Sequence, residues 1–329
     1  MSKNFHLLIP GLLPATQFKF EQSFQNLSQL LSKAQIKPQE NLSLESQMIK
    51  FFGLVQSTLP AGALCALYYD VIERTQTDQN FCQVDPVQTR LDAHTAFLIQ
   101  TLYSHLDSHE TSKLKSALDI LFDPTNQLNC QEDSWFCALT KMEDLSANPI
   151  WDVLGKSLHC RLPSGPDAAT YQRLMTECEM LLSAQSFGTQ DDQCHVDSLW
   201  FWGFGTLPEI INTDFDLVLS NEVSIKGLAK CANIGYAGLP KVPTLDLLGD
   251  NILLVDTTLL KLQTQGAITD WMDKIQDYDL GWMSLLLEGL RSGEVSSVNL
   301  DLGQDIHYKI TKNNLHYFWR KVKSVESFI

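Results

Sequence analysis

The segment Asp85-Pro-Val-Gln-Thr-Arg90-Leu-Asp92 places two carboxylates and one guanidinium close together in the chain. A guanidinium can hold a phosphate or a carboxylate through two parallel hydrogen bonds, and neighbouring acids can orient it. Arg90 is therefore a candidate anion-binding residue, with Asp85 and Asp92 as its supports. The alternative is structural: an internal salt bridge, with Asp92 capping a helix that follows. The residue types leave both interpretations open.

A second candidate is the apolar run Ser198-Leu-Trp-Phe-Trp-Gly-Phe-Gly205. A short apolar run that ends in glycines is typical of a central parallel strand followed by a tight crossing. Loops at the carboxyl ends of such strands are where α/β folds bind ligands. On this reasoning the run contributes ligand-binding residues, which are Trp200, Trp202, Gly203, Gly205 and Thr206.

Motifs that would identify a particular chemistry are absent. The sequence has no GxxxxGK[ST], no HExxH and no GxSxG. Gly203-Phe-Gly205 is half of a dinucleotide fingerprint, and Pro208 stands where a helix should open. His105 and His109 could share a helix face, but a solvated junction between two helices is the preferred interpretation. We therefore expect no cofactor and no metal site, and we assign no catalytic residues.

Composition limits the class of protein. The chain has 329 residues, 44% of them hydrophobic, and a formal net charge of −15. The charge argues against nucleic-acid binding, and no apolar run approaches the roughly 20 residues of a membrane helix. The basic cluster Arg320, Lys321 and Lys323 is expected to be a solvated end. Eight cysteines without a CxxC pair indicate reduced thiols and a cytoplasmic protein. An effector exported without a cleaved signal peptide would have the same features.

The elements that must position these residues alternate along the chain. Short apolar runs predict strands at 5–9, 134–139, 198–205, 215–219 and 252–255. Apolar residues at helical spacing predict helices at 20–34, 44–54, 60–73, 92–106, 111–122, 168–185 and 270–291, with Asp167 as an N-cap. This order favours an α/β fold with a mainly parallel sheet and helices on both faces.

The C-terminal part has a different pattern. Apolar and polar residues alternate around Val298, Leu300 and Leu302, and again around Tyr308 and Ile310. Together with 315–319, this pattern predicts a three-stranded antiparallel meander over 294–321, at the edge of the sheet. We expect a single α/β domain over 1–329, in which 81–165 could form an inserted subdomain.

Three segments together resemble one protein family. They are residues 85–92, residues 197–208, and the ending from Leu290-Arg-Ser-Gly-Glu through Phe318-Trp-Arg-Lys321. In order and spacing they resemble the bacterial RpfE-type regulatory proteins. These are similar, more distantly, to the archaeal-type cofactor-independent phosphoglycerate mutases of the alkaline phosphatase superfamily. The resemblance covers most of the chain and implies the fold of that superfamily.

The resemblance also implies where catalytic ligands should stand. Active mutases of this kind use two divalent metals, Mn or Zn, with a Ser or Thr nucleophile and Asp and His ligands. Their first strand ends in Asp-Gly, whereas here it is followed by Pro10-Gly11. Their late strand leads into a His- and Asp-rich stretch, whereas residues 251–262 contain one Asp and no His. The resemblance therefore implies the mutase scaffold without mutase catalysis.

Three functions remain compatible with the sequence. The first is a catalytically degenerate, regulatory relative that binds a small anionic ligand or a protein partner, with no membrane or nucleic acid involved. The second is an active Mn- or Zn-dependent phosphoglycerate mutase or phosphatase. The third is an exported effector or interaction scaffold, in which Tyr308, Tyr317 and Trp319 form a surface; alternatively, these aromatic residues pack at the sheet edge.

Overall fold

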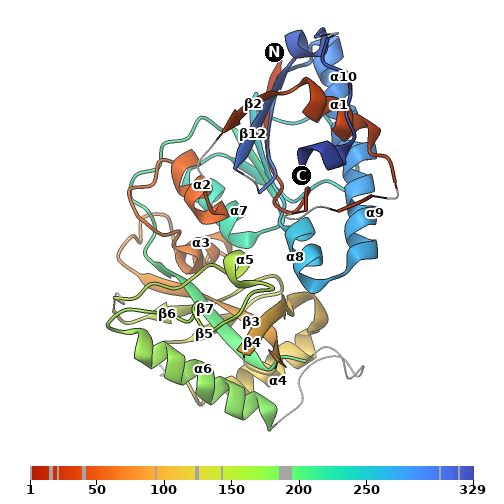
Figure 1. Ribbon diagram of the computed structural model, residues 1–329. Coiled ribbons are helices and arrows are strands. Elements are labelled where there is room, and N and C mark those ends of the chain that lie inside the picture. Colours follow the sequence, from red (N-terminus) through yellow and green to blue (C-terminus); the bar gives the residue numbers. More distant parts are fainter. Residues whose placement is uncertain are drawn as a thin grey trace. The chain divides into compact units, whose positions relative to one another are not determined.

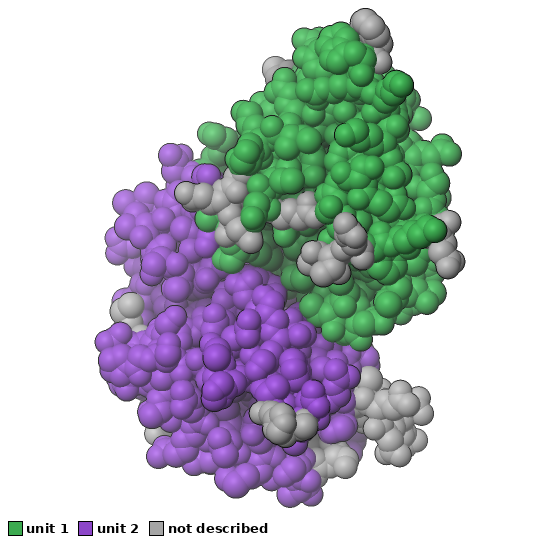
Figure 2. Space-filling view, in the orientation of Figure 1, with its two compact units in different colours: residues 1–44, 213–222, 233–329 green, residues 45–212, 223–232 purple. Residues whose placement is uncertain are grey.

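The chain divides into two compact units, shown in green and purple in Figure 2. A computed structural model describes residues 2–14, 18–20, 22–38, 42–92, 95–122, 126–141, 144–184, 195–303, 305–317 and 319–329. Unit 1 comprises Met1–Leu44, Thr213–Glu222 and Asn233–Ile329, and unit 2 comprises Glu45–Asn212 and Val223–Ala232. The segment 81–165 lies within unit 2.

Unit 1 contains a seven-stranded mixed sheet in the order β2-β12-β11-β1-β10-β8-β9. Strand β1 pairs in parallel with β10 and β11, β8 pairs in parallel with β10 and β9, and β12 pairs antiparallel with β11 and β2. The strands predicted at 5–9, 215–219 and 252–255 are confirmed within a few residues. The bounds are β1 Lys3–Leu8, β2 Gln35–Pro38, β8 Leu217–Ser220, β9 Gly235–Ala237, β10 Asn251–Val255, β11 Val295–Asp301 and β12 Ile306–Thr311.

One face of this sheet carries the apolar core of unit 1. Successive side chains of a strand point to opposite faces, so Phe5 and Leu7 lie in the core while His6 lies on the other face. The helices that complete the core are α1 (Gln25–Lys33), α8 (Thr258–Gln265), α9 (Ile268–Tyr278) and α10 (Ser284–Ser292), of which α9 and α10 are joined by a π-helical turn (Figure 1). The expected covering of one sheet by helices on both faces stays a prediction.

The predicted C-terminal meander is corrected in its third strand. Strands β11 and β12 form the expected antiparallel pair. After Thr311 the chain turns into a short helix, α11 (Lys312–Leu315), whose first amides are capped by Thr311 and Asn314. The neighbour of β12 is instead β2, from early in the chain. Of the predicted third strand, Phe318 lies outside the described residues.

Unit 2 contains a second sheet, which the sequence did not predict. Its strands are β3 (Asn80–Asp92), β4 (Thr95–Thr101), β5 (Leu128–Cys130), β6 (Trp135–Leu139) and β7 (Ser198–Gly205), and every pair is antiparallel. The strand at 198–205 is confirmed, but its expected parallel pairing is wrong because β7 runs antiparallel to β3. The sheet of unit 1 is mixed and that of unit 2 is antiparallel, so the expected mainly parallel sheet is not confirmed.

The helix predicted at 92–106 is also wrong. Residues 95–101 form β4, which pairs with the second half of β3, and pairing partners outweigh helical spacing in so short a segment. Asp92 accordingly ends a strand and caps no helix. Four helices of unit 2 fall close to their predicted positions: α2 Leu44–Phe51, α3 Ala61–Tyr68, α4 Ser108–Leu118 and α6 Ala168–Ser183. Two more, α5 Ile150–Val153 and α7 Val223–Cys231, were not predicted. Among the described residues, no helix is long and apolar enough to cross a membrane.

Candidate functional site

The carboxylate of Asp85 lies at the centre of a buried hydrogen-bond cluster in unit 2. Asp85 is 1% exposed and accepts hydrogen bonds from the hydroxyl of Tyr103 at 2.6 Å, from Nε2 of Gln83 at 3.1 Å, and from the indole N–H of Trp202. Burial, together with the Asp85 charge, raises the pKa of Tyr103 well above its usual value. These donors use both oxygens of the carboxylate, so Asp85 joins β3 to β7 and to the turn that contains Tyr103.

The other residues of the predicted anion site do not join this cluster. Arg90 and Asp92 are exposed, toward the end of β3 that pairs with β4. The indole N–H of Trp200 donates to the main-chain oxygen of Asn148 at 2.9 Å. Asp85 and Trp202 are therefore in contact through their side chains. Trp200 stands opposite Asp85 in the pairing of β3 with β7, but its indole donates to Asn148 instead, and Arg90 and Asp92 lie farther along β3.

Gly203 and Gly205 line a separate cavity of about 280 Å³ in unit 2. Gly203 has φ +61°, and a Cβ there would lie 2.5 Å from the Cβ of Ala61, so glycine is needed for β7 to pack closely on α3. Glu45 faces this cavity and accepts a hydrogen bond from the amide of Leu59 at 2.8 Å. Burial raises the pKa of Glu45 to about 7, outweighing that hydrogen bond. The main-chain oxygen of Thr206 accepts from Gln56.

The carboxyl ends of β1, β8 and β10 form one edge of the unit 1 sheet, where the resemblance would require metal ligands. Here Asp256 is 3% exposed and accepts from the hydroxyls of Thr258 and Tyr278, both at 2.5 Å. Glu222 forms an ion pair with Lys261 at 2.6 Å. The two carboxylates are thus already bound by side chains of unit 1.

The turn after β1 is shaped by packing. Gly11 has φ +84°, and a Cβ there would lie 2.7 Å from the main-chain nitrogen of Leu260. Its carbonyl oxygen accepts from the indole of Trp271 at 2.8 Å. Pro10 stands where the resemblance requires a carboxylate. The described residues at this edge therefore do not fit a two-metal centre.

A cluster of two histidines and one aspartate lies on the sheet face opposite the core of unit 1. Nε2 of His6 is 2.5 Å from Oδ2 of Asp301, and Nδ1 of His307 is 2.9 Å from Oδ1 of the same carboxylate. The pairing of β1 with β11 and of β11 with β12 brings these three residues together. Burial opposes the ionisation of Asp301, but the hydrogen bonds from His307 and His6 outweigh it and lower the pKa below its usual value.

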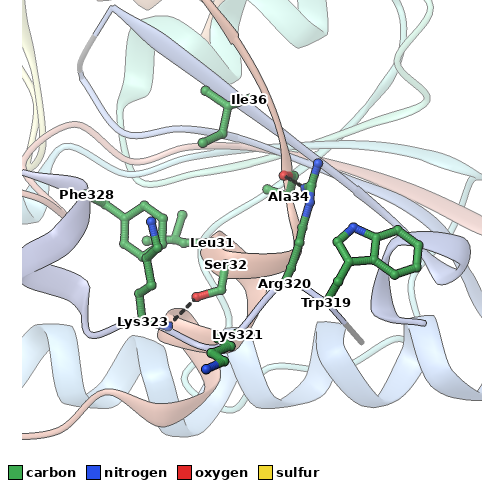
Figure 3. Close-up of a pocket in the computed structure, with 9 residues that line it drawn as sticks. All are labelled: Leu31, Ser32, Ala34, Ile36, Trp319, Arg320, Lys321, Lys323 and Phe328. Atoms are coloured by element: carbon green, nitrogen blue, oxygen red, sulfur yellow. Dashed lines mark hydrogen bonds between the residues drawn. The ribbon is translucent and has the colours of Figure 1, made fainter. Parts of the chain in front are cut away.

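The basic cluster near the end of the chain lines a groove of about 560 Å³ in unit 1, shown in Figure 3. Arg320 extends to the end of α1, where it donates to the main-chain oxygens of Lys33 and Ala34. Lys33 in turn donates to the main-chain oxygens of Tyr317 and Arg320, each at 2.6 Å. This reciprocal clamp satisfies carbonyl groups that a helix end leaves unpaired.

The cations and rings of this groove face solvent. Lys321 and Lys323 are exposed, and Trp319 is 63% exposed and stacks on Tyr317 with ring centroids 4.9 Å apart. Tyr308, by contrast, is 1% exposed and packs in the core, so the aromatic residues of this region divide between the two predicted roles. The lining residues are Leu31, Ser32, Ala34, Ile36, Trp319, Arg320, Lys321, Lys323 and Phe328, none of them acidic.

Fold and sites together define a mixed α/β protein with one mixed and one antiparallel sheet. No protein-family model matches the chain, and no curated protein matches it. Among solved structures, the chain is similar to the cofactor-independent phosphoglycerate mutase from Thermoplasma acidophilum DSM 1728, with 13% identity, 99% of this chain and 94% of that chain covered, and a TM-score of 0.45.

The chain is also similar to the PH0037 protein from Pyrococcus horikoshii. This likeness has 12% identity, covers 93% of this chain and 85% of that chain, and has a TM-score of 0.44. Both TM-scores are below 0.5, so neither likeness carries an inference about this chain.

Sequence reasoning missed the His6 cluster, and it predicted the basic cluster as a solvated end without predicting the groove that these residues line. His6 stands 295 positions before Asp301 and still farther before His307, so no local motif marks the cluster. The available signal is a polar residue inside an apolar strand, since His6 interrupts Phe5 and Leu7. For the groove, the signal is the interleaving of Tyr317, Trp319 and cations.

Proposed function

We propose that this chain is a phosphoglycerate-mutase-related regulatory protein that binds a small anionic ligand and does not catalyse metal-dependent phosphotransfer. The binding site is the groove of Figure 3, which is lined by Lys321, Lys323 and the exposed ring of Trp319. The observation that carries the proposal is this cluster of cations in a groove without acids, in a chain with a net charge of −15.

The chemistry of the groove suits a phosphate or a carboxylate attached to a flat apolar group. Among the described residues, no carboxylate forms an ion pair with Lys321 or Lys323, so their charges are available to a ligand. Arg320 adds a third positive charge, although one of its nitrogens is used in the clamp with α1. The volume of about 560 Å³ falls in the range of roughly 300–1,000 Å³ that is common for small-molecule sites.

The absence of mutase catalysis is proposed from the residues at the carboxyl edge of the unit 1 sheet. A two-metal mechanism requires carboxylates and imidazoles that are free to coordinate. Asp256 and Glu222 are instead bound to Tyr278 and to Lys261, and Pro10 offers no ligand. We expect no interconversion of 3- and 2-phosphoglycerate in a coupled assay with added Mn²⁺ or Zn²⁺. Turnover that is lost in Asp256→Asn would contradict the proposal.

Anion binding is tested by calorimetric titration with inorganic phosphate and with 3-phosphoglycerate. Lys321→Glu combined with Lys323→Glu is expected to abolish binding of whichever anion binds the wild type. The matched control is Lys113→Glu, which reverses the charge of an exposed lysine on α4 of unit 2. Equal loss in the control would indicate a general charge effect. Binding that is unchanged in the groove variant would place the ligand elsewhere.

A further inference from the structure

Three neighbouring strands of unit 1 place ligand atoms of His6, Asp301 and His307 around one point. These atoms lie within 4.8 Å of one another. The two imidazole rings have centroids 5.7 Å apart, and each faces a different oxygen of the same carboxylate. The donors therefore converge from β1, β11 and β12 on the face of the sheet opposite the core cluster.

Both ring nitrogens of His307 face side-chain oxygens. Nδ1 lies 2.9 Å from Oδ1 of Asp301, and Nε2 lies 3.2 Å from Oδ1 of Asn299. A neutral imidazole has a single N–H to donate. In the tautomer whose Nε2 donates to Asn299, Nδ1 presents its lone pair on the side of Asp301, which is how a metal-binding histidine offers a nitrogen to an ion.

From these contacts we propose that His6, Asp301 and His307 bind one divalent transition-metal ion, with Zn²⁺ as the ion that fits best. Two imidazole nitrogens and a carboxylate are a ligand set that zinc accepts, and a fourth position would remain for solvent or a small ligand. Asn299 accepts from the outer nitrogen of His307, which is the kind of contact that fixes the orientation of a metal-bound histidine. The site goes beyond the proposed anion binding and does not depend on it.

Coordination would require the donors to rearrange. Zinc bonds to nitrogen and oxygen are about 2.0–2.2 Å long, so two ligands at a tetrahedral angle lie about 3.4 Å apart. The nitrogen–oxygen distances of 2.5 and 2.9 Å are hydrogen-bond contacts, which would lengthen by about 0.5–0.9 Å as the ion replaces the hydrogens. The most distant ligand atoms, at most 4.8 Å apart, would move closer together.

The site uses none of the residues at which the family resemblance would require metals, although Asp301 ends β11 beside the carboxyl end of β1. His6 precedes the turn at Pro10 and Gly11 and lies within β1. Neither His6 nor His307 belongs to the residues after β1 or β10 that the resemblance singles out. His6 is 13% exposed and His307 is 18% exposed, while Asp301 is buried, so an ion could reach the site from the histidine side.

The experiment is a titration of the metal-free full-length chain with Co²⁺, followed by visible absorption and then by displacement with Zn²⁺. We expect one Co²⁺ per chain, with the visible bands of a low-symmetry nitrogen and oxygen site that Zn²⁺ abolishes. His6→Gln and Asp301→Asn should each remove these bands, and Asn299→Ala should weaken Zn²⁺ binding by about 10- to 100-fold. The matched control is His105→Gln with His109→Gln, a pair outside the cluster.

Several outcomes would overturn the proposal. These are the absence of stoichiometric Co²⁺ binding, bands that persist in both His6→Gln and Asp301→Asn, and bands that are lost in the His105 and His109 control. Intense near-ultraviolet charge-transfer absorption would assign the ion to cysteine thiolates and would also overturn it. If Asp301→Asn fails to fold by circular dichroism, His6→Gln and His307→Gln decide the outcome, since both keep polar groups on the same strands.

Discussion

Two buried carboxylates, Asp85 in unit 2 and Asp301 in unit 1, are held by different kinds of donor. Asp85 is 1% exposed and accepts from a phenol, an indole and an amide, whereas Asp301 is 2% exposed and contacts two imidazoles. Phenol, indole and amide donors hold their hydrogens across the physiological range, so they fix one arrangement. An imidazole can exchange its proton for a metal ion, so the second arrangement can change its occupant.

The type of donor, and not the position in the chain, therefore distinguishes a carboxylate with a structural role from one that can bind a ligand. Both carboxylates are far from solvent, and burial alone does not distinguish them. What distinguishes them is whether the donor can release its hydrogen at neutral pH. A buried acid surrounded by donors of fixed protonation is an anchor, whereas one between two imidazoles is a candidate ligand.

The largest expected effect is that of Asp85→Ala. The substitution removes the acceptor of three donors, of which the Tyr103 hydroxyl keeps the main-chain oxygen of Val84, and each buried donor left unpaired costs about 1–3 kcal/mol. We expect the free energy of unfolding, measured by urea titration, to fall by about 3–5 kcal/mol, because the donors of Gln83 and Trp202 lose this acceptor inside the protein. Arg90→Ala, on the exposed end of the same strand, should change it by less than about 0.5 kcal/mol. Similar losses for the two variants would show that the buried contacts of Asp85 do not stabilise unit 2 more than an exposed side chain does.

Glu45→Gln addresses a carboxyl group of unit 2 that has fewer donors than Asp85. Its pKa is raised from 4.5 to about 7 by burial, so the folded protein holds this proton more tightly than the unfolded chain does. The free energy of unfolding should therefore fall as pH rises from about 4.5 to about 7, and then level off. The variant lacks this dependence and should be more stable than the wild type at pH 8, by up to about 3 kcal/mol.

This prediction is checked by chemical unfolding at several pH values. Glu132→Gln is the control, because Glu132 is exposed in the same unit. A variant that keeps the wild-type pH profile would show that Glu45 does not cause it.

Tyr103→Phe removes a single donor from Asp85 and should have an intermediate effect. The single hydrogen of this hydroxyl is shared between Asp85 and the main-chain oxygen of Val84 at 2.9 Å, and the hydroxyl oxygen accepts from the amide of Trp135 at 3.3 Å. We expect a loss of about 1–2 kcal/mol in the free energy of unfolding, measured by urea titration. Tyr278→Phe should cost a similar amount, because its hydroxyl donates to buried Asp256 in the same way. A large difference between the two would mean that donors to buried carboxylates are not equivalent in the two units.

The smallest effect is expected for His6→Gln in metal-free protein. Glutamine can still donate to Asp301, so we expect a change below about 1 kcal/mol in the free energy of unfolding. Added Zn²⁺ should raise the melting temperature of the wild type and leave that of the variant unchanged, and a chelator should reverse the rise. A rise of equal size in the variant would show that His6 does not bind Zn²⁺, and Asp301 would then be a structural carboxylate like Asp85.

The sequence predicted the elements whose signal is local. The apolar runs at 5–9 and 252–255 identify β1 and β10, and helical spacing identifies α6 within two residues. The prediction failed where pairing with another strand determines the structure. Residues 95–101 are compatible with a helix or a strand, and their pairing with β3 makes them a strand. The pairing direction of β7 failed for the same reason, since an apolar strand can pair either way.

The sites show the same division. Asp85 and Trp202 were identified as candidates, and they are in contact, but burial makes their contact structural. His6, Asp301 and His307 escaped attention because sheet pairing brings them together from the two ends of the chain. No spacing rule could have revealed a site of this kind.

The position of β1 in its sheet has a consequence for synthesis on the ribosome. β1 pairs with β10 and β11, and the register joins Lys3 to Val295 and Asn4 to Asn251. At a translation rate of roughly 5–20 residues per second, the partners of this strand emerge roughly 15–60 s after it does. During that interval an apolar strand, with Phe5 and Leu7 on one side, has no sheet to join, and such segments aggregate readily. The nascent chain therefore needs β1 to be shielded, by a chaperone or by transient contacts, until the last quarter of the protein is made.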